Sequence, residues 1–354
     1  MNKVIYEDMK QIYGRFADLN WLKNQSVFIT GAYGMLASYL TFFLIFLNEQ
    51  VPEMNLQIYA QGRSIEKMSN RFGEYLDKAY FHVVTDDICQ PLFTLDKIDY
   101  IIHAASLASP QYYGINPVGT LLPNTIGTYY LLELARQKKV KGFLFFSSSE
   151  IYGVYPDGLQ EVSEANYGYV DPINIRNCYS ESKRMGESMC KAWSDQFGVP
   201  AKSVRIYHTY GPTMDIEHDQ RSFSEFVRNV VDGKDIEMKS DGKTVRAFCY
   251  AADAVDAFLR VLRDGLPGES YNLCNSQGEL SIAELAELLV NLRPEKKLKV
   301  IRAARSENDS YLESPVRKTP FVNTRKLREL GWNPTYSVAQ GFRNTVYSFE
   351  CNTN

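Results

Sequence analysis

The chain has 354 residues, 45% of them hydrophobic and 23% charged, which is enough apolar material for one large domain or two closely joined ones. Its formal net charge of -3 gives no sign of a nucleic-acid or anionic-membrane partner. The strongest apolar run, at 39–47, falls well short of the roughly 20 residues that a membrane span needs. Six scattered cysteines and four histidines form no zinc spacing, so no metal site is predicted. The segment 1–20 is mixed and charged, unlike a signal peptide, and a cytoplasmic protein with reduced thiols is expected.

Six short apolar runs predict β-strands, and they alternate with helical patterns. The strands are expected at 27–30, 56–60, 81–84, 100–104, 143–147 and 203–207, and the helices at about 34–48, 65–78, 117–138 and 179–197. The strands are nearly continuously apolar, which is typical of parallel strands covered on both faces. This alternation predicts an α/β fold with a Rossmann-type, doubly wound parallel sheet.

Beyond about residue 208 the pattern changes to shorter elements separated by loops that contain Gly and Pro. Two helices are expected there, at about 281–292 and 324–330. We therefore predict a smaller, mostly C-terminal α/β substrate domain. The expected division is an N-terminal extension at 1–24, a Rossmann domain at 25–207 with return segments near 245–275, and a substrate domain mainly at 208–354.

The first predicted strand runs into the sequence TGAYGMLA at 30–37, which suits a dinucleotide. Gly31 and Gly34 permit a tight turn that brings backbone N–H groups close to a pyrophosphate. The helix that starts near Met35 adds a favourable dipole at its N-terminus. A plain strand-to-helix turn can contain the same glycines, but the position after the first strand and before a long helix favours a cofactor.

The second predicted strand ends in the sequence QGRS at 61–64, without the acid that usually holds the adenosine ribose of NAD. Arg63 and Ser64 could instead receive the 2′-phosphate of NADP, although an arginine in a solvated loop fits equally well. Asp87 and Ile88 follow the third strand, where a side chain could meet the adenine. For Asp87, a turn-forming role is the alternative. The cofactor is expected to be NAD or NADP.

Tyr179 and Lys183 lie four positions apart, on one face of a predicted helix. A nearby ammonium and a cationic nicotinamide can lower the pKa of the tyrosine. Its phenolate can then accept a hydroxyl proton as hydride leaves the same carbon. The pair alone is common by chance, but here it follows the sequence SSSE at 147–150, which ends a predicted core strand. A serine hydroxyl at that place can bond the same substrate oxygen, so the features together predict nicotinamide redox chemistry.

The chain resembles the extended short-chain dehydrogenases/reductases that act on nucleotide-sugars, over about residues 25–345, and within them it is most similar to UDP-glucuronate decarboxylases. The similar stretches are HAASLASP at 103–110, NTIGT at 124–128, SSEIYG at 148–153, RNCYSESKR at 176–184 and VRAF at 245–248. The resemblance implies that Ser148 is the catalytic hydroxyl, Tyr179 the base and Lys183 its partner. Glu150 matches an acid that decarboxylases and nucleotide-sugar 4,6-dehydratases place beside the sugar ring. A surface glutamate is the alternative for Glu150.

The same resemblance implies which residues contact the ligands. For the cofactor, it adds Ala104, Ala105 and Ser106 to the glycine turn. For a nucleotide-sugar, the candidates are Asn124, Arg176, His208, Arg221, Arg246 and Arg317. Arginine suits this role because a guanidinium group pairs bidentately with phosphate. A buried structural amide is the alternative for Asn124, and an ordinary exposed side chain is the alternative for the arginines.

Several departures from the family pattern weaken the assignment of UDP-glucuronate as the substrate. His208 stands where relatives usually carry Asn, and Thr213 replaces an arginine that is common in decarboxylases. The acid after the second strand is missing. Ser149 stands where dTDP-glucose 4,6-dehydratases have an aspartate, which argues against that activity.

Three functions remain open from the sequence. The first is an internal redox cycle on a nucleotide-hexose or nucleotide-hexuronate, in which oxidation at C4 enables decarboxylation, elimination or epimerisation. The second is a net NADP-dependent reductase of a nucleotide-linked keto-sugar or ketose. The third is a non-catalytic nucleotide-binding protein, since fold alone does not confer activity. The resemblance also implies a homodimer through the helices at 117–138 and 179–197, whose apolar residues could equally be intramolecular core.

Overall fold

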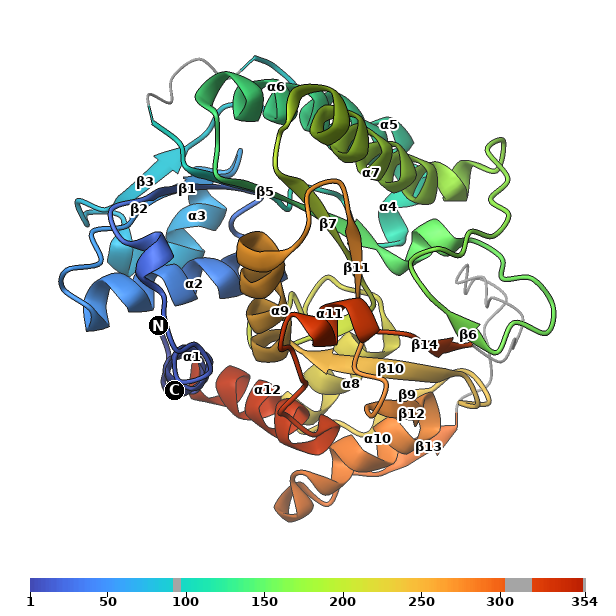
Figure 1. Ribbon diagram of the computed structural model, residues 1–354. Helices are drawn as coiled ribbons and strands as arrows, with labels where there is room; N and C mark the ends of the chain where they lie inside the picture. The colour runs from blue at the N-terminus through green and yellow to red at the C-terminus, as the bar shows by residue number, and fades with distance from the viewer. Residues whose placement is uncertain (92–96, 303–319, 353–354) are drawn as a thin grey trace.

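The computed structural model describes residues 1–91, 97–302 and 320–352, and its largest element is a seven-stranded parallel sheet (Figure 1). The strand order is β11-β7-β5-β4-β1-β2-β3. The strands are β1 (Ser26–Thr30), β2 (Gln57–Gln61), β3 (Phe81–Val84), β4 (Tyr100–His103), β5 (Gly142–Ser148), β7 (Ala201–Ile206) and β11 (Ser270–Leu273). Every residue of β1, β4 and β5 is buried, which explains their apolar sequences. The predicted Rossmann-type α/β sheet is confirmed.

Helices cover both faces of this sheet. One face carries α2 (Met35–Gln50), α3 (Ile65–Phe72) and α9 (Ala251–Asp264), and the other carries α5 (Pro117–Leu122), α6 (Thr128–Lys138) and α7 (Cys178–Phe197) (Figure 1). The apolar run at 39–47 lies within α2 and is buried throughout. Within the described ranges, no helix is both long enough and apolar enough to span a membrane.

The helix predicted at 117–138 is divided into three parts. α5 ends at Leu122, a π-helical segment covers Pro123–Gly127, and α6 begins at Thr128. Proline has no N–H to donate, and its ring blocks the carbonyl four residues earlier, so the regular α-helical pattern cannot continue through Pro123. Single π-helical turns of this kind are frequent at functional sites, and this one contains Asn124.

The C-terminal part of the described chain forms smaller sheets, one of them with a strand from the middle of the sequence. β8 (His208–Tyr210), β10 (Val245–Tyr250) and β12 (Glu279–Ser281) form one, β9 (Ile236–Met238) pairs with β13 (Val300–Arg302), and β6 (Glu161–Val162) pairs with β14 (Phe321–Val322). The helices here are α8 (Ser222–Val231), α10 (Ile282–Asn291), α11 (Arg325–Glu329) and α12 (Val338–Asn352). Between them the chain returns to the large sheet, because α9 packs on β5 and β11 pairs with β7. The division into domains stays a prediction.

The N-terminal extension contains helix α1 (Lys3–Tyr13), which lies against α2, α9 and α12 (Figure 1). Its Asp8 is buried and accepts hydrogen bonds from three tyrosine hydroxyls. They belong to Tyr39 of α2, to Tyr250 just before α9 (2.5 Å) and to Tyr336 shortly before α12 (2.7 Å). Burial raises the pKa of Asp8, and the tyrosine hydrogen bonds act in the opposite direction. α1 thus joins segments that are far apart in the sequence.

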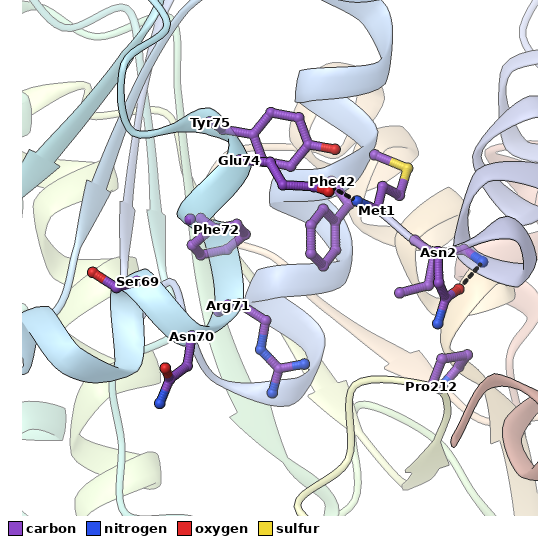
Figure 2. Close-up of a pocket in the computed structure, with 12 residues that line it drawn as sticks. Met1, Asn2, Phe42, Ser69, Asn70, Arg71, Phe72, Glu74, Tyr75 and Pro212 are labelled. Carbon is purple, nitrogen blue, oxygen red and sulfur yellow. Dashed lines mark hydrogen bonds and ion pairs between the residues drawn. The ribbon is translucent and has the colours of Figure 1, made fainter. Parts of the chain in front are cut away.

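Next to α1, a pocket of about 350 Å³ opens between α2, the end of α3 and the loop after β8 (Figure 2). Arg71 of α3 lies at this pocket and donates a hydrogen bond to the carbonyl of Thr213 (3.1 Å). The Thr213 hydroxyl donates to the carbonyl of Met35, the first residue of α2 (2.8 Å). The threonine that departs from the family pattern therefore fixes its loop to the helix that follows the glycine turn.

Candidate active site

The glycine turn brings the ends of neighbouring strands together. Gly31 has a φ of +63°, and a Cβ there would lie 2.8 Å from the Cα of Ala105, so the turn requires glycine. The Gly31 N–H donates to the side-chain oxygen of Gln61 at the end of β2 (3.0 Å). The hydroxyl of Thr30, the last residue of β1, accepts hydrogen bonds from the N–H groups of Ala104 and Ala105 (3.1 Å each). The ends of β1 and β2 and the chain after β4 therefore meet at this turn.

The groups at this edge of the sheet fit a nicotinamide dinucleotide. Gly34 precedes α2 and gives it no side-chain cap, so the N–H groups of the first turn, from Met35 onward, can face an anion. The hydroxyl of Ser106 is buried and has no hydrogen-bond partner in the described part of the chain. A buried hydroxyl without a partner is costly, and a bound ligand would remove that cost. Gly31, Gly34, Ala104 and Ala105 lie together here, and the contacts of every predicted cofactor residue with the cofactor stay predictions.

The predicted adenosine side is formed by the loops after β2 and β3. Arg63 is exposed, and Ser64 caps α3 by accepting the N–H of the third residue after it (3.2 Å). Asp87 is exposed, and its carboxylate accepts the N–H two residues later (2.9 Å). This contact is the turn-forming role named as the alternative for Asp87. Ile88 is buried in the core beside it.

Ser148, Tyr179 and Lys183 come together where β5 ends beside α7. The Tyr179 hydroxyl is hydrogen-bonded to Ser148. The Lys183 ammonium lies 5.6 Å from the centroid of the Tyr179 ring and donates to the carbonyl of Phe146 in β5 (2.6 Å). All three side chains are buried. Ser148, which is far from the Tyr179–Lys183 pair in the sequence, thus joins it in one cluster.

Burial dominates the acid–base behaviour of this cluster. It raises the pKa of Tyr179 to about 12, while the hydrogen bond with Ser148 acts in the opposite direction. It lowers the pKa of Lys183 to about 7, and the negative charge of Glu187 opposes that change. The lowered tyrosine pKa expected from the sequence does not arise from the protein's own groups, because desolvation disfavours the charged phenolate.

Glu150 and Arg176 border the catalytic cluster. The N–H of Glu150 donates to the Ser148 hydroxyl (3.2 Å), so this side chain begins next to the serine. Its carboxylate lies 3.7 Å from the guanidinium of Arg176, and the two side chains are 42% and 39% exposed. A carboxylate and a guanidinium are therefore both accessible beside the catalytic hydroxyls.

Three further substrate candidates, His208, Arg221 and Arg246, come from the C-terminal part of the described chain. Arg221 precedes α8 and forms hydrogen bonds with the carboxylate of Asp219 (2.8 and 3.0 Å). Burial lowers the pKa of His208 to about 3, and the positive charges of Arg246 and Arg221 lower it further. The His208 imidazole is therefore neutral at pH 7 and can donate one hydrogen bond and accept another. Arg317 lies outside the described residues.

Asn124 is fully buried in the π-helical segment. Its amide nitrogen donates to the carbonyl of Thr120 (2.9 Å) and to the hydroxyl of Ser182 in α7 (3.1 Å). Its amide oxygen has no hydrogen-bond partner among the residues that the structure describes. The bond to Ser182 holds the π-helical segment against α7, and both the structural role and a contact with substrate stay predictions.

A sequence model described as the NAD dependent epimerase/dehydratase family matches residues 27–274. The chain belongs to this family. It is similar to UDP-glucuronic acid decarboxylase 1 of Xenopus tropicalis, with 32% identity over 326 residues that cover 91% of this chain and 72% of that protein. It is also similar to UDP-glucuronic acid decarboxylase 6 of Arabidopsis thaliana, with 31% identity over 322 residues that cover 90% and 87%. The chain is thus an enzyme of the extended short-chain dehydrogenase/reductase type and uses NAD or NADP.

Solved structures share the epimerase/dehydratase fold. The UDP-glucose 4-epimerase of Thermotoga maritima, solved with UDP-glucose, has a TM-score of 0.75 at 21% identity, covering 93% of this chain and 100% of that one. The dTDP-glucose 4,6-dehydratase of Bacillus anthracis, solved with NAD, has a TM-score of 0.71 at 21% identity, covering 93% and 97%. At this identity the likeness is one of fold.

Sequence reasoning missed an aromatic residue in this epimerase/dehydratase site. Tyr113 lies in α4 (Gln111–Ile115), and its ring stacks on that of Tyr179, with centroids 4.8 Å and planes 10° apart. Its hydroxyl donates to the carbonyl of Ala108 (2.9 Å). The signal in the sequence was its place directly after the family-like stretch at 103–110. Tyr113 covers one face of the catalytic ring.

Sequence reasoning also missed a buried ion pair behind the catalytic cluster. Glu187 lies one helical turn after Lys183 in α7, and its carboxylate is 2.8 Å from the guanidinium of Arg205 in β7. Glu187 also accepts hydrogen bonds from the hydroxyls of Ser147 (2.5 Å) and Ser270 (3.0 Å). Because Ser147 directly precedes the catalytic serine, the ion pair fixes the end of β5 to α7, β7 and β11.

Proposed function

We propose that this enzyme oxidises the C4 hydroxyl of a nucleotide-linked hexuronate with bound NAD or NADP and thereby enables its decarboxylation. The observation that carries the proposal is the placement of Glu150 and Arg176 beside the hydrogen-bonded hydroxyls of Ser148 and Tyr179. Oxidation of an alcohol needs a proton acceptor, whereas the added carboxylate suits proton transfer at a neighbouring carbon. The similarity to UDP-glucuronic acid decarboxylases supports the same assignment.

The oxidation step depends on the two catalytic hydroxyls. The phenolate of Tyr179 takes the proton of the C4 hydroxyl, while Ser148 holds the same oxygen by a hydrogen bond. The positive charge of Lys183, close to the Tyr179 ring, stabilises the phenolate. A dinucleotide held at the glycine turn of Gly31 and Gly34 would supply the reversible acceptance of hydride from C4.

Decarboxylation follows from the position of the new ketone. The carboxylate on C5 is β to a ketone at C4, so the electrons of the C5–C6 bond can move toward the ketone oxygen as CO2 leaves. Arg176 is the cation suited to bind this carboxylate, and Glu150 is placed to move a proton to C5. Return of hydride to C4 and of the proton from Tyr179 gives a nucleotide-linked pentose, without net oxidation.

We assign the nucleotide diphosphate to Arg221 and Arg246, with the neutral His208 near them as a hydrogen-bonding group. The electrostatic coupling of both arginines to His208 supports their placement on one side of the site. Guanidinium groups pair bidentately with phosphate oxygens, which explains the residue type. Arg317 stays a candidate from the sequence.

Incubation of the purified protein with UDP-glucuronate, without added cofactor, tests this proposal. We expect release of CO2 and formation of a UDP-pentose, detected by mass spectrometry, with bound cofactor acting catalytically. UDP-glucose, dTDP-glucose and GDP-mannose are tested in parallel, and Tyr179→Phe serves as the inactive control. If none of these compounds gives a product although the protein contains intact cofactor, the proposal is wrong.

A second candidate function is net reduction of a nucleotide-linked keto-sugar or ketose by NADPH. The observation that favours it is the exposed Arg63 at the end of β2, where no acid is present. This function predicts that one NADPH is consumed for each product molecule. A reaction that proceeds with a catalytic amount of cofactor excludes it. A non-catalytic protein is disfavoured because Tyr179 and Lys183 are both retained, and unchanged biological activity of Tyr179→Phe would favour it again.

We also propose that the enzyme is a homodimer. The outer surface of α5, α6 and α7 is free in Figure 1 and carries exposed apolar side chains. Together with the π-helical segment between α5 and α6, these helices expose Val118, Leu122, Ile126, Tyr129 and Met185. The first four follow helical spacing, and such an apolar stripe is typical of a helical interface. Light scattering coupled to size-exclusion chromatography measures the mass directly, and a monomeric mass at all concentrations would contradict the proposal.

A cytoplasmic location is likewise a proposal. All six cysteines are free thiols, and they lie within the described residues. Burial raises the pKa of Cys190 and Cys274, so these two thiols resist oxidation. Free thiols suit a reducing compartment. Fractionation of the cells that produce the enzyme tests the location.

A further inference from the structure

We propose that the cofactor is NADP rather than NAD, held through its 2′-phosphate by Arg63 and Lys67. The inference concerns the cofactor site of the function proposed above. The family description names NAD. In proteins that bind NAD, an Asp or Glu after the second strand usually hydrogen-bonds to the 2′-hydroxyl of the adenosine ribose, whereas a nearby Arg accommodates the 2′-phosphate of NADP. The residues around the end of β2 favour NADP.

No carboxylate occupies the place of the ribose-binding acid. β2 ends at Gln61, and the sequence GRS follows. The Gln61 side chain cannot replace an acid, because it is buried and both of its ends are already bonded. Its oxygen accepts the N–H of Gly31 (3.0 Å), and its nitrogen donates to the carbonyl of Asp86 (2.8 Å). Gln61 therefore shapes the glycine turn and is not available to the ribose.

Two cationic side chains border the same place. Arg63 is exposed, and its positive charge acts on the thiol of Cys89 in the loop after β3, on the expected adenine side. Lys67 lies in the first turn of α3, with its ammonium 5.8 Å from the centroid of the Tyr33 ring. Neither cation forms an ion pair with another described residue.

Tyr33 connects these cations to the expected pyrophosphate site. It belongs to the glycine turn, and its ring covers Gly62, where a Cβ would lie 2.5 Å from the ring. The ring thus lies between the turn and the loop that carries Arg63. A dinucleotide with its pyrophosphate at the turn would extend its adenosine ribose toward this loop.

Electrostatics then distinguishes the two cofactors. A phosphate monoester carries a charge of about -1.5 to -2 at pH 7, whereas a ribose hydroxyl carries none. Arginine matches phosphate with two parallel hydrogen bonds, and lysine adds a point charge. The acid nearest in sequence is Glu66, which is exposed in the first turn of α3. Glu66 is the residue that would serve NAD if the proposal were wrong, so it supplies the matched control.

Two binding measurements test the proposal. The nucleotide released from the purified protein by acid is identified by mass spectrometry, and titration calorimetry gives the affinities of wild type, Arg63→Ala, Lys67→Ala and Glu66→Gln for NADP⁺ and NAD⁺. We expect bound NADP and at least about tenfold tighter binding of NADP⁺ by the wild type. Arg63→Ala should weaken NADP⁺ binding by about tenfold or more, and Lys67→Ala by less, with NAD⁺ binding unchanged as the test of folding. Glu66→Gln should change neither affinity.

Tighter binding of NAD⁺ by the wild type would overturn the proposal, as would an equal loss of both affinities in Arg63→Ala. A loss of NAD⁺ binding in Glu66→Gln would overturn it too, because the ribose would then be held by an acid. These readouts do not require turnover. A preference for NADP⁺ without any product therefore counts against the proposed reaction alone, and product formed with bound NAD counts against this inference alone.

Discussion

Replacing Glu187 by glutamine changes the charge of the group behind the catalytic cluster and leaves its shape almost the same. Arg205 donates hydrogen bonds to both carboxylate oxygens of Glu187 (2.8 and 3.0 Å). Glutamine keeps one oxygen as an acceptor, but its nitrogen cannot accept the other bond. Arg205 would lose its counter-charge with its side chain only 1% exposed. Removing one partner of a buried ion pair costs about 3–5 kcal/mol. Because Glu187 is 11% exposed and glutamine retains one acceptor, we expect a loss of unfolding free energy near the lower end, about 3 kcal/mol.

Urea unfolding at pH 7, followed by tryptophan fluorescence, measures this loss. The matched control is Glu329→Gln, whose ion pair with Arg325 lies on the surface, with side chains 59% and 82% exposed. A surface pair of this kind contributes little, so the control should lose less than about 0.5 kcal/mol. The pH dependence of turnover gives a second readout. Glu187 holds up the pKa of the Lys183 ammonium, so its removal should move the alkaline limit of turnover to lower pH.

The other titratable groups that face Lys183 allow this pH shift to be assigned to Glu187. The imidazole of His103 and the thiol of Cys190 also lie near its ammonium, but burial keeps both neutral. A double variant, Glu187→Gln with Arg205→Met, leaves no buried unpaired charge and should regain part of the lost stability. The alkaline limit of turnover of this double variant should stay at the lower pH. Equal urea midpoints for Glu187→Gln and Glu329→Gln, together with an unchanged alkaline limit, would refute the reasoning.

Four further predictions concern the catalytic cluster, its borders and the subunit interface. Tyr179→Phe removes the proton acceptor and should lower turnover by at least about 100-fold, with the amount of bound nucleotide unchanged; a smaller loss would assign the proton to another group. Burial lowers the pKa of Lys183 to about 7, so above this pH the unfolded lysine keeps a proton that the folded one has lost. The unfolding free energy of wild type relative to Lys183→Met should therefore rise by up to about 1.4 kcal/mol per pH unit between about pH 7 and 10, and urea titrations with a constant difference would contradict this. Arg176→Met should weaken binding of UDP-glucuronate by about tenfold and that of UDP-glucose by less than about twofold, and equal effects in calorimetry would remove its carboxylate role. Ile126→Glu should convert the expected dimer into a monomer in light scattering, whereas an intact dimer would place the interface elsewhere.

The parts of the site that follow from local patterns could be predicted from the sequence. Tyr179 and Lys183 share a helical face because of their spacing, and the structure places both on α7. Gly31 could be predicted because a sharp turn between a strand and a helix needs a positive φ, which is the value found. The strand ends differ from the predicted ones by only a few residues, since a continuous apolar run has clear borders. Hydrophobic periodicity and turn chemistry were therefore enough to predict the parallel sheet and the shared helical face of Tyr179 and Lys183.

The parts of the site that were not predicted depend on contacts between elements that are distant in the sequence. In the sequence, Glu187 looks like an ordinary glutamate of a helix. Its role depends on Arg205 of β7, which the fold places against it. The stacking of Tyr113 on Tyr179 requires α4 and α7 to be adjacent, which no local pattern indicates. The high pKa of Tyr179 likewise arises from burial by the whole fold. Pro123 is an exception, because its break of the helix was visible in the sequence and was missed.

The buried carboxylate of α1 has a consequence for how the chain is made. Asp8 and Tyr336 are 328 residues apart in the sequence, yet they share a hydrogen bond. At a synthesis rate of about 5–20 residues per second, roughly 16 to 66 s pass between the emergence of the two residues from the ribosome. During that time Asp8 lacks one of its partners, although Tyr39 and Tyr250 are already present. The contacts that hold α1 are therefore completed only when the segment before α12 has been made.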